Sequence, residues 1–549
     1  MSVVLRKTAS NRGQALVTAV IVMMMVAMFS LSYITFTSTN LMRANRDDRR
    51  NTTFFLAEAG VEYVVSKTVE ALTLNPDSLT STTYGSEITA VLDSLRSGAT
   101  GSVTLTAGSG MTATITSSAT YRGITERIRV RVKFRNVGVW NNAVFAGIGQ
   151  SGRGINGNVD IRGSVHILGE GDPFSDTNGN GKWDPAESFT DENGNGVFDP
   201  GEPFADADGN GVWAPAEPYQ DRNLNGAYDP PLTATDLATD VSGSANIGNN
   251  YSGIPVALSS KIPGLSTITY KGEFVQSLGA ELRVKHGKVN ISGAAVVGSA
   301  NVAGNSVKET VDGSYVSDGY GGNQGASGVH SDNGTAQGYD LGDRVGFPTL
   351  LDPYRDPATG IEYASRESFL DATSLVFTES NIKSGTPSFT HSDANGNSIS
   401  WDDITKTLTI NGIVRINGNL DMCSKGSTMY YAGRGTMFSK GTVKVHGSVM
   451  PKTMFPTTDV MGVIAKYDIE FATGIGESQL NGAGAWYAQR KIVSAKQNQF
   501  AGTYVADYFD MGTNVPSIYQ VPTLATNLPP GMPGAEGIIA AQTLSWRHL

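Results

Sequence analysis

The chain begins with an apolar segment and continues with apolar positions at helical spacing. Residues 15–36 are largely apolar, and about 20 such residues are enough to cross a bilayer as a helix. Beyond them, apolar side chains recur at mostly helical intervals, with Gly60 as the weakest helix former. The pattern predicts one long helix over residues 14–75, apolar first and amphipathic later. The recurring side chains of its later part are Phe55, Ala59, Val61, Tyr63, Val64 and Val69.

Most of the remaining chain is patterned for strands. Residues 102–116 and 125–134 alternate between apolar and polar side chains, as half-buried strands do. They predict a small β subdomain over residues 76–137, packed on the end of the helix.

Short alternating stretches punctuated by glycine follow, at residues 156–169, 287–298, 407–422 and 441–450. Inward β-branched side chains with glycine at the corners favour a parallel β-helix or an irregular β-solenoid. An ordinary β-sandwich is the alternative. The prediction places the first coils at 138–170 and a glycine-rich β body at 233–549, with a flexible loop at 319–343. The fold class is therefore mainly β with one long N-terminal helix. In the first stretch the inward positions are Val159, Ile161, Val165 and Ile167.

The charges around the apolar segment predict its orientation. Arg6, Lys7 and Arg12 precede it, and positive charge usually stays on the cytoplasmic side. We therefore expect a single pass through the inner membrane with the C-terminal body outside the cytoplasm. A cleaved signal peptide is the alternative, but the apolar core is long and no small-residue cleavage site follows it closely.

Two short sequences carry a family resemblance: "RGQALVTAVIVMM" at residues 12–24 and "FFLAEAGVEYVV" at residues 54–65. Residues 1–75 resemble the PilX-type N-terminal segment of type IV pilus minor pilins and pilin-like proteins. The resemblance implies a leader over residues 1–13, cleavage by prepilin peptidase between Gly13 and Gln14, and methylation of the mature N-terminus. It also implies that the helix packs against other pilin subunits.

The sequence departs from major pilins at the fifth mature position, where they usually have glutamate. Thr18 stands there instead. Through the resemblance, this favours a rare, tip-located or initiating subunit over one that polymerises efficiently.

Charge is concentrated in one block of this 549-residue chain. Residues 170–229 hold 14 acidic and two basic side chains, a net charge of −12, whereas the whole chain carries −10. The remainder is therefore close to +2, and the block indicates bound cations rather than a generally acidic surface. No basic cluster is large enough for a phosphate track, so we expect no nucleic-acid partner. Cys423 is the only cysteine, which excludes intramolecular disulfides and Cys-based metal sites.

The acidic block contains four loops with a period of 15, beginning at Asp176, Asp191, Asp206 and Asp221. Calcium loops supply oxygens from positions 1, 3, 5 and 9, a backbone carbonyl from position 7 and a bidentate glutamate from position 12. A glycine at position 6 makes their sharp turn. The four loops follow this pattern and predict tandem calcium-binding repeats over residues 171–232, with Ca²⁺ as the cofactor.

Two positions depart from the pattern. Ala214 occupies position 9 of the third loop, where a water often serves. Leu232 occupies position 12 of the fourth loop, so we expect that site to be the weakest or incomplete. The predicted ligands are Asp176, Asn178, Asn180, Lys182, Asp184 and Glu187; Asp191, Asn193, Asn195, Val197, Asp199 and Glu202; Asp206, Asp208, Asn210, Val212 and Glu217; and Asp221, Asn223, Asn225, Ala227 and Asp229.

The spacers exclude paired EF-hands. Only residues 188–190, 203–205 and 218–220 separate the loops, too few for helices. Two recurring aromatic series predict that each unit packs an aromatic pair on its neighbour. In loop style the array resembles thrombospondin type 3 repeats, and we expect calcium to stiffen it. The alternative is that the Asx-Gly clusters make turns without metal, which four loops in register disfavour.

Catalytic motifs are weak. The six histidines are scattered, and the alternation predicts that His166 and His446 are exposed strand residues. Asp402 and Asp403 form either a carboxylate pair or a turn at a strand entry.

We therefore predict a pilin-like, membrane-anchored structural protein, not an enzyme, that acts in pilus assembly or adhesion. Its expected partners are other pilins, the inner membrane, prepilin peptidase and a surface or carbohydrate target. The alternatives are a polysaccharide-degrading β-helix enzyme and an envelope scaffold that never polymerises.

Overall fold

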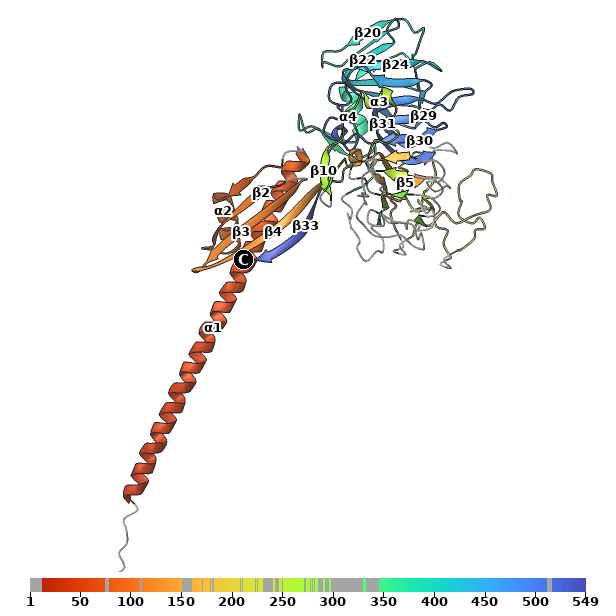
Figure 1. Cartoon of the computed structure of the whole chain (residues 1–549). Helices are drawn as coiled ribbons and strands as arrows, with labels where there is room; N and C mark the ends of the chain where they lie inside the picture. The colour runs from red at the N-terminus through yellow and green to blue at the C-terminus, as the bar shows by residue number, and fades with distance from the viewer. Residues whose placement is uncertain are drawn as a thin grey trace, which may run out of the picture. The chain divides into compact units, whose positions relative to one another are not determined.

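The chain divides into two compact units in the computed structural model (Figure 1). Unit 1 comprises Met1–Arg135 and Ile539–Leu549, and unit 2 comprises Asn136–Ile538. Unit 2 is therefore an insertion in the chain of unit 1. The predicted leader, except its last two residues, and most of the predicted 319–343 loop lie outside the described residues. The structure describes residues 12–74, 79–108, 111–150, 160–169, 171–177, 179, 182–207, 209, 211–222, 224, 226–230, 240–241, 246–248, 250–270, 273–276, 278, 280, 282–284, 290–291, 296–297, 329–331, 345–510 and 516–549.

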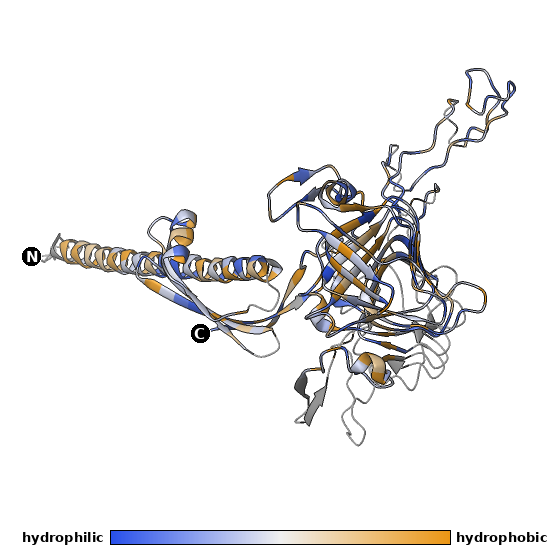
Figure 2. Cartoon of the chain, turned by 90° about the horizontal axis from the view of Figure 1, so that it is seen from above, coloured by the Kyte–Doolittle hydropathy of each residue, from blue (hydrophilic) through white to orange (hydrophobic). Residues whose placement is uncertain are grey.

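The predicted long helix is confirmed as α1 (Arg12–Leu74). Its first half is apolar and exposed from Leu16 to Met42, as the hydropathy colouring in Figure 2 shows. An 18-residue window there has a mean hydropathy of 2.2 and no burial, so the helix is long and apolar enough to cross a membrane. Three hydroxyls in this half bond to the carbonyl four residues earlier, so the helix itself satisfies them. They belong to Thr35, Thr37 and Thr39.

The second half of α1 packs on an antiparallel sheet. Leu56, Val61 and Val64 are buried in the shared core. A β-carbon on Gly60 would lie 2.8 Å from the Ser117 hydroxyl oxygen, so this glycine lets the helix and sheet approach closely. The sequence pattern had placed Phe55 in the apolar series, but its side chain is 63% exposed.

The sheet of unit 1 has the order β1-β2-β3-β4-β33. The predicted strand 102–116 is two antiparallel strands, the first ending at Ala107 and the second beginning at Thr112. The C-terminal strand lies at the edge of this sheet, so the predicted assignment of residues 539–549 to the body is wrong. The elements beside α1 are β1 (Thr82–Tyr84), α2 (Ser86–Leu95), β2 (Thr100–Ala107), β3 (Thr112–Tyr121), β4 (Ile124–Asn136) and β33 (Ile539–His548).

A buried carboxylate fastens the C-terminal strand. Glu126 of β4 accepts a bond from Nε of Arg50 at 2.8 Å and contacts Nε2 of His548 at 2.5 Å. Burial alone would raise the pKa of Glu126, but the hydrogen bonds from His548 and Arg50 outweigh it and hold the pKa below its ordinary value. One side chain thus connects α1, β4 and β33.

Unit 2 consists mainly of short strands that pair in parallel with strands about 18–26 residues away in the chain. Its described elements up to residue 331 are η1 (Val139–Asn141), β5 (Val144–Gln150), β6 (Asp160–Arg162), β7 (Val165–Ile167), β8 (Asp240–Val241), β9 (Asn246–Gly248), α3 (Val256–Ser259), β10 (Thr267–Tyr270), β11 (Glu273–Gln276), β12 (Leu282–Val284), β13 (Asn290–Ile291), β14 (Val296–Val297) and β15 (Val329–Ser331). Strand β15 lies within the segment predicted as a flexible loop.

The later elements of unit 2 continue the same architecture. They are β16 (Tyr354–Arg355), β17 (Glu362–Tyr363), α4 (Arg366–Thr373), β18 (Leu375–Phe377), β19 (Asn381–Ile382), β20 (Phe389–Ser392), β21 (Ser398–Asp402), β22 (Thr407–Ile416), β23 (Leu420–Met422), β24 (Thr428–Ala432), β25 (Arg434–Ser439), β26 (Val443–Val445), β27 (Ser448–Pro451), β28 (Val460–Ala465), β29 (Asp468–Phe471), β30 (Asn481–Ser494), β31 (Gln499–Asp510), β32 (Ser517–Tyr519) and η3 (Pro522–Leu524).

The coils are not stacked in chain order. Along one face the parallel neighbours run β18, β22, β25, β28, β30, β31, β5, β7, β12, β15. The chain enters in the middle at β5 and winds outward to β15. It restarts at the opposite end with β18 and winds back to β31, which pairs with β5. Figure 1 shows β20, β22 and β24 at one end of unit 2.

The segment that connects the two halves runs along the outside of the coils. The Pro348 carbonyl accepts a bond from the Tyr487 hydroxyl of β30 at 2.6 Å. Further along, Glu367 meets Lys466 at 2.9 Å, and Asp371 meets Arg415 of β22 at 2.7 Å. These contacts follow the order β30 to β22 and hold the segment against successive coils.

Inward side chains form a continuous apolar column through the stack. Strand register aligns Val463 with Trp486, Trp486 with Tyr504, Tyr504 with Val144 and Val144 with Val165, and all are buried. The predicted inward residues Ile161, Val165 and Ile167 are likewise buried, while Val159 lies outside the described residues.

The predicted exposure of His166 is wrong. Its side chain is wholly buried and its ring lies 5.1 Å from that of Phe145. Alternation correctly shows which side of a strand faces inward. It does not show whether another segment of the chain covers the outer side of the sheet and buries the side chains there. Phe347 covers the outward side chain of Tyr487 in the same sheet in this way.

Replacing Glu126 with glutamine should destabilise unit 1 at neutral pH by about 1–2 kcal/mol, because the charged acceptor for Arg50 and His548 is lost. A lowered folded-state pKa stabilises the protein above the unfolded pKa, and this contribution is lost as pH falls through the folded value. The difference between wild type and E126Q should therefore shrink below pH 4.5. Urea denaturation at neutral and acidic pH measures it. E70Q, which removes an exposed carboxylate from α1 of the same unit, is the control, and an equal loss in both variants would contradict the assignment.

Candidate calcium-binding repeats

The structure describes most of the predicted ligands. Six of them lie outside the described residues: Asn178, Asn180, Asp208, Asn210, Asn223 and Asn225. Of the predicted backbone ligands at position 7, Val197 and Val212 have side chains that are 63% and 66% exposed. This exposure fits residues that would contribute only a carbonyl.

The second loop is the most completely described. Asp191 accepts backbone N–H bonds from Gly194 at 2.6 Å and from Gly196 at 2.7 Å. These bonds, that from Gly196 foremost, lower the pKa of Asp191. Both glycines have positive φ, 74° and 77°, which residues with a β-carbon adopt only with strain. The loop is therefore wrapped around its first carboxylate.

The amide side chains of the same loop are also ordered. The amide oxygen of Asn193 accepts the Asn195 N–H at 2.9 Å, and that of Asn195 accepts the Val197 N–H at 2.7 Å. Their amide groups donate to Asp199 at 2.5 and 2.8 Å. Oxygens from positions 1, 3, 5 and 9 are thus held within one short loop.

The bond from the glycine at position 6 to the first carboxylate recurs in the third and fourth loops. Asp206 accepts the Gly211 N–H at 2.9 Å, and Asp221 accepts the Gly226 N–H at 2.7 Å. The shared bond shows that the 15-residue repeat in sequence is a repeat in backbone conformation.

The second loop has its closing carboxylate in place. Glu202 accepts the N–H of Glu192 at 3.0 Å and of Asp199 at 2.9 Å. These are positions 2 and 9 of the loop that begins at Asp191. The geometry agrees with the predicted role of Glu202 at position 12.

Glu187 does not close the loop to which the sequence pattern assigns it. Its carboxylate accepts the N–H of Ala207 at 2.7 Å and of Ala214 at 3.0 Å, which are positions 2 and 9 of the third loop. Trp213 of that loop donates its indole N–H to the Glu187 carbonyl at 2.8 Å. The prediction that Glu187 closes the first loop is wrong for this structure.

Glu217 makes the reciprocal contacts. It accepts the N–H of Thr177 at 2.7 Å and of Asp184 at 3.2 Å, positions 2 and 9 of the first loop. The Trp183 indole donates to the Glu217 carbonyl at 2.8 Å. The first and third loops have therefore exchanged their closing glutamates.

The fourth loop is closed by a residue that the loop pattern did not reveal. Asp172 accepts the N–H of Arg222 at 2.9 Å and of Asp229 at 3.0 Å, again positions 2 and 9. Burial raises the pKa of Asp172. Asp172 stands 15 residues before Glu187, so extending the period upstream would have found it. Asp172 thus supplies a carboxylate to the fourth loop, whose position 12 is Leu232; that this site is the weakest or incomplete stays a prediction.

The spacers explain the exchange, because they pair as an antiparallel hairpin. Phe174 bridges Tyr219, and Phe189 bridges Phe204. Backbone bonds flank each bridge, among them Ala205 N–H to the Ser188 carbonyl at 2.8 Å. The array therefore folds back on itself, with the second loop at its tip.

Two aromatic clusters pack the hairpin. Phe198 stacks on Trp213 at 4.6 Å, which joins the second and third loops. Trp183 stacks on Tyr228 at 4.3 Å, which joins the first loop to the fourth. The predicted packing on the sequence neighbour therefore holds for one cluster and not for the other.

The base of the hairpin is fastened to the coils. The buried side chain of Gln489 in β30 donates to the Arg222 carbonyl and accepts the Leu350 N–H at 2.7 Å. Arg222 itself donates to the Gly171 carbonyl at 3.2 Å. One glutamine thus fixes the array and the connecting segment to the same strand.

The donor set of these loops suits a hard cation. It consists of carboxylate, amide and backbone oxygens without sulfur or imidazole, which is the preference of calcium. No three His, Cys, Asp or Glu side chains in the described part of the chain are grouped to hold a metal. A calcium loop also uses side-chain amide and backbone carbonyl oxygens as ligands, and these are not among the His, Cys, Asp and Glu groups.

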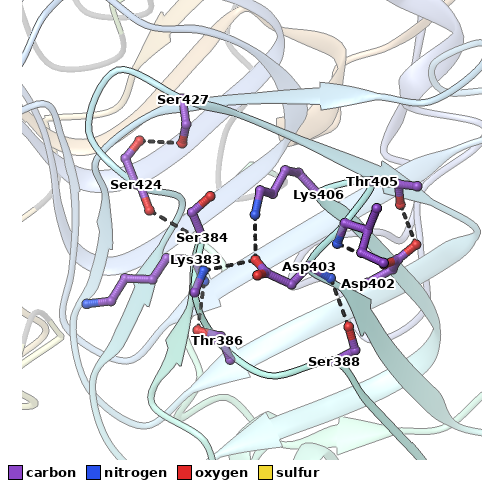
Figure 3. Close-up of polar contacts among 12 residues, drawn as sticks. Lys383, Ser384, Thr386, Ser388, Asp402, Asp403, Thr405, Lys406, Ser424 and Ser427 are labelled. Carbon is purple, nitrogen blue, oxygen red and sulfur yellow. Dashed lines mark hydrogen bonds and ion pairs between the residues drawn. The ribbon is translucent and has the colours of Figure 1, made fainter.

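Asp402 and Asp403 form a turn. Asp402 accepts the Ile404 N–H at 3.0 Å and the Thr405 hydroxyl at 2.7 Å, while Asp403 binds Lys406 at 2.6 Å (Figure 3). Hydrogen bonds lower the pKa of both carboxyls, from Thr405 foremost for Asp402 and from Lys406 foremost for Asp403. Neither is thus held protonated, as a general acid for glycoside cleavage would be.

A hollow of about 390 Å³ lies beside this turn; hydroxyl-bearing side chains make up most of its lining, to which Asp402 and Lys452 also contribute. At another corner of the coils, His446 is half-buried, not exposed as predicted. Its Nδ1 lies 2.6 Å from Glu477, and its Nε2 lies 3.6 Å from Asp421.

Comparison with known proteins finds a distant structural likeness and no family. No family model matches the chain, and no curated protein matches it. Among solved structures it is similar to the competence-associated pilin ComZ from Thermus thermophilus, with 15% identity over 91% of this chain and 97% of that chain and a TM-score of 0.48. So distant a likeness does not by itself support an assignment of function.

Replacing Phe198 with alanine should loosen the tip of the hairpin by about 1–3 kcal/mol, because the stack on Trp213 and its edge contacts are lost. Hydrogen exchange read by mass spectrometry should accelerate in peptides covering 188–213 and stay unchanged in the coils. V197A alters an exposed neighbour and serves as the control. Unchanged exchange in F198A would show that the aromatic cluster does not support the tip.

Proposed function

We propose that this chain is a pilin-like, membrane-anchored structural protein of a type IV pilus or related assembly, with calcium-stiffened repeats on its extracellular body. The helix α1 carries the proposal. Its second half is buried against its own sheet, whereas its first half, from Leu16 to Met42, is exposed apolar surface in the described chain. Such a surface requires a bilayer or the apolar helices of other subunits.

The sequence of the same helix supports the pilin assignment. The PilX-like segment implies processing between Gly13 and Gln14, and the departure at Thr18 favours a minor subunit. The protein would therefore be held in the inner membrane with its body outside, or be incorporated in a surface pilus. A surface or carbohydrate target would bind at the hydroxyl-lined hollow beside Asp402.

Calcium binding is supported by the wrapped loops and their oxygen donors. Carboxylates such as Asp191, Asp199 and Glu202 lie within one short loop, where their mutual repulsion opposes compaction. A bound Ca²⁺ supplies the opposite charge. The loop residues orient the oxygens. The aromatic stacks pack neighbouring loops together, so that ordering one loop by calcium also orders the loop packed against it.

Processing is testable by mass. If prepilin peptidase removes residues 1–13, deleting the peptidase gene in the native host should leave the full N-terminus, and G13L should do so in a wild-type host. Intact-mass spectrometry of the purified chain reads both. The same N-terminal mass with and without the peptidase would refute processing. Recovery of the processed chain in membranes but never in sheared filaments would favour the scaffold alternative.

Calcium binding is testable on the full chain in detergent. Calorimetric titration should show saturable binding within about 10⁻⁴–10⁻³ M, the range of extracellular modules, and hydrogen exchange across 171–229 should slow. The matched control is D176N/D191N/D206N/D221N, which removes the first carboxylate of every loop. No binding near millimolar calcium, or equal binding by the control, would refute calcium as the ligand.

A further inference from the structure

The four closing carboxylates form a series with the same 15-residue period as the loops. Each precedes a spacer, and each is buried: Asp172 is 3% exposed, Glu187 8%, Glu202 8% and Glu217 4%. Acidic side chains are seldom so deeply buried unless paired. Each accepts the backbone N–H groups of positions 2 and 9 of one loop. The repeating unit is therefore a carboxylate, a spacer and a loop, in that order.

The carboxylates serve the loops in reverse order. The first, Asp172, reaches the fourth loop; Glu187 reaches the third, Glu202 the second and Glu217 the first. The closure of the second loop by Glu202 looks local only because that loop is at the tip. A hairpin requires this reversal, because the residues of its two arms pair in opposite order.

We propose that the array binds four calcium ions in sites that are each shared between two repeat units, with Asp172 completing the fourth. This inference rests on the proposed calcium binding and deepens it. Each ion would join a loop on one arm to a carboxylate on the other, except at the tip. Calcium would therefore fasten the two arms together, in contrast to a row of separate loops along a stalk.

Shared sites couple the ions to one another. Closing a chain segment costs entropy that grows with its length, and Asp172 and Asp229 are 57 residues apart. An ion in the first or third site joins the two arms. The remaining sites then have a shorter free segment of chain to close. Binding should therefore be positively cooperative, and the array should stiffen as one body.

The assignment is tested by counting sites in double variants of the full chain in detergent, with ⁴⁵Ca equilibrium dialysis at about millimolar free calcium. E187Q and D206N should each remove one site of four, and the double variant E187Q/D206N should still lose only one, because both residues serve the third site. E187Q/D176N should lose two. The reverse result, one site lost in E187Q/D176N and two in E187Q/D206N, would establish closure within each loop and overturn the proposal.

The fourth site is tested in the same way with D172N. It should remove one site, and D172N/D221N should remove no more than D172N. Four sites remaining in D172N would overturn the role of Asp172. The charge-matched control is E192Q, which alters an exposed carboxylate in the second loop and should keep all four sites. No binding by the wild-type chain would instead refute calcium as the ligand.

A calcium-free measurement separates the hairpin from the metal. In a C423S background, S188C/A205C should form a disulfide under mild oxidation, because these residues are backbone partners across the arms. S188C/Q220C should not, since Gln220 pairs near Pro173. Efficient cross-linking of the second pair, or none of the first, would contradict the reversed order whatever the calcium result.

Discussion

The parallel pairing of β31 with β5 is the contact on which the rest of unit 2 depends. It joins the last coil of the chain to the first, with Tyr504 beside Val144 and Val505 beside Phe145. Without it, two half-stacks would each present open strand edges, which invite wrong pairing. Because the contact spans some 360 residues of chain, as in the Thr503 to Asn142 bond, the closed stack must form late in folding.

The same contact makes the insertion possible. It places the residues before β5 near those after β31: the Val137 N–H binds the Ile538 carbonyl at 2.7 Å, and the Trp140 indole binds the Pro533 carbonyl at 2.8 Å. The chain therefore leaves and re-enters unit 1 at neighbouring points. A stack wound in chain order would separate its ends by the height of all its coils, about 4.8 Å for each. The permuted order removes that separation, so β4 and β33 can remain neighbours.

How much of this the sequence predicts depends on whether an interaction is local. The long helix, the strand alternation and the loop conformation around Asp191 follow from short-range spacing, and they are as predicted. The partner of Glu187 is not local, because a 15-residue period is equally compatible with closure in the same loop and in another. The loop pattern does not reveal Asp172, because the first loop begins at Asp176 and Asp172 lies before it. A 15-residue period traced through the closing carboxylates includes it. The burial of His166 was missed because it depends on covering segments far away in sequence.

The hairpin obeys the constraint that governs unit 2 itself. An insertion within a coil must return close to where it departs, and reversed pairing achieves this: the Asp172 N–H binds the Asp229 carbonyl at 2.8 Å. A linear stalk of four loops would leave its far end remote from the coil. The molecule thus contains two nested insertions with adjoining ends, the hairpin in the coils and the coils in the small sheet. The hairpin is fastened to the coils at its base, where Gln489 donates to the Arg222 carbonyl, and α1 has its own core with the small sheet.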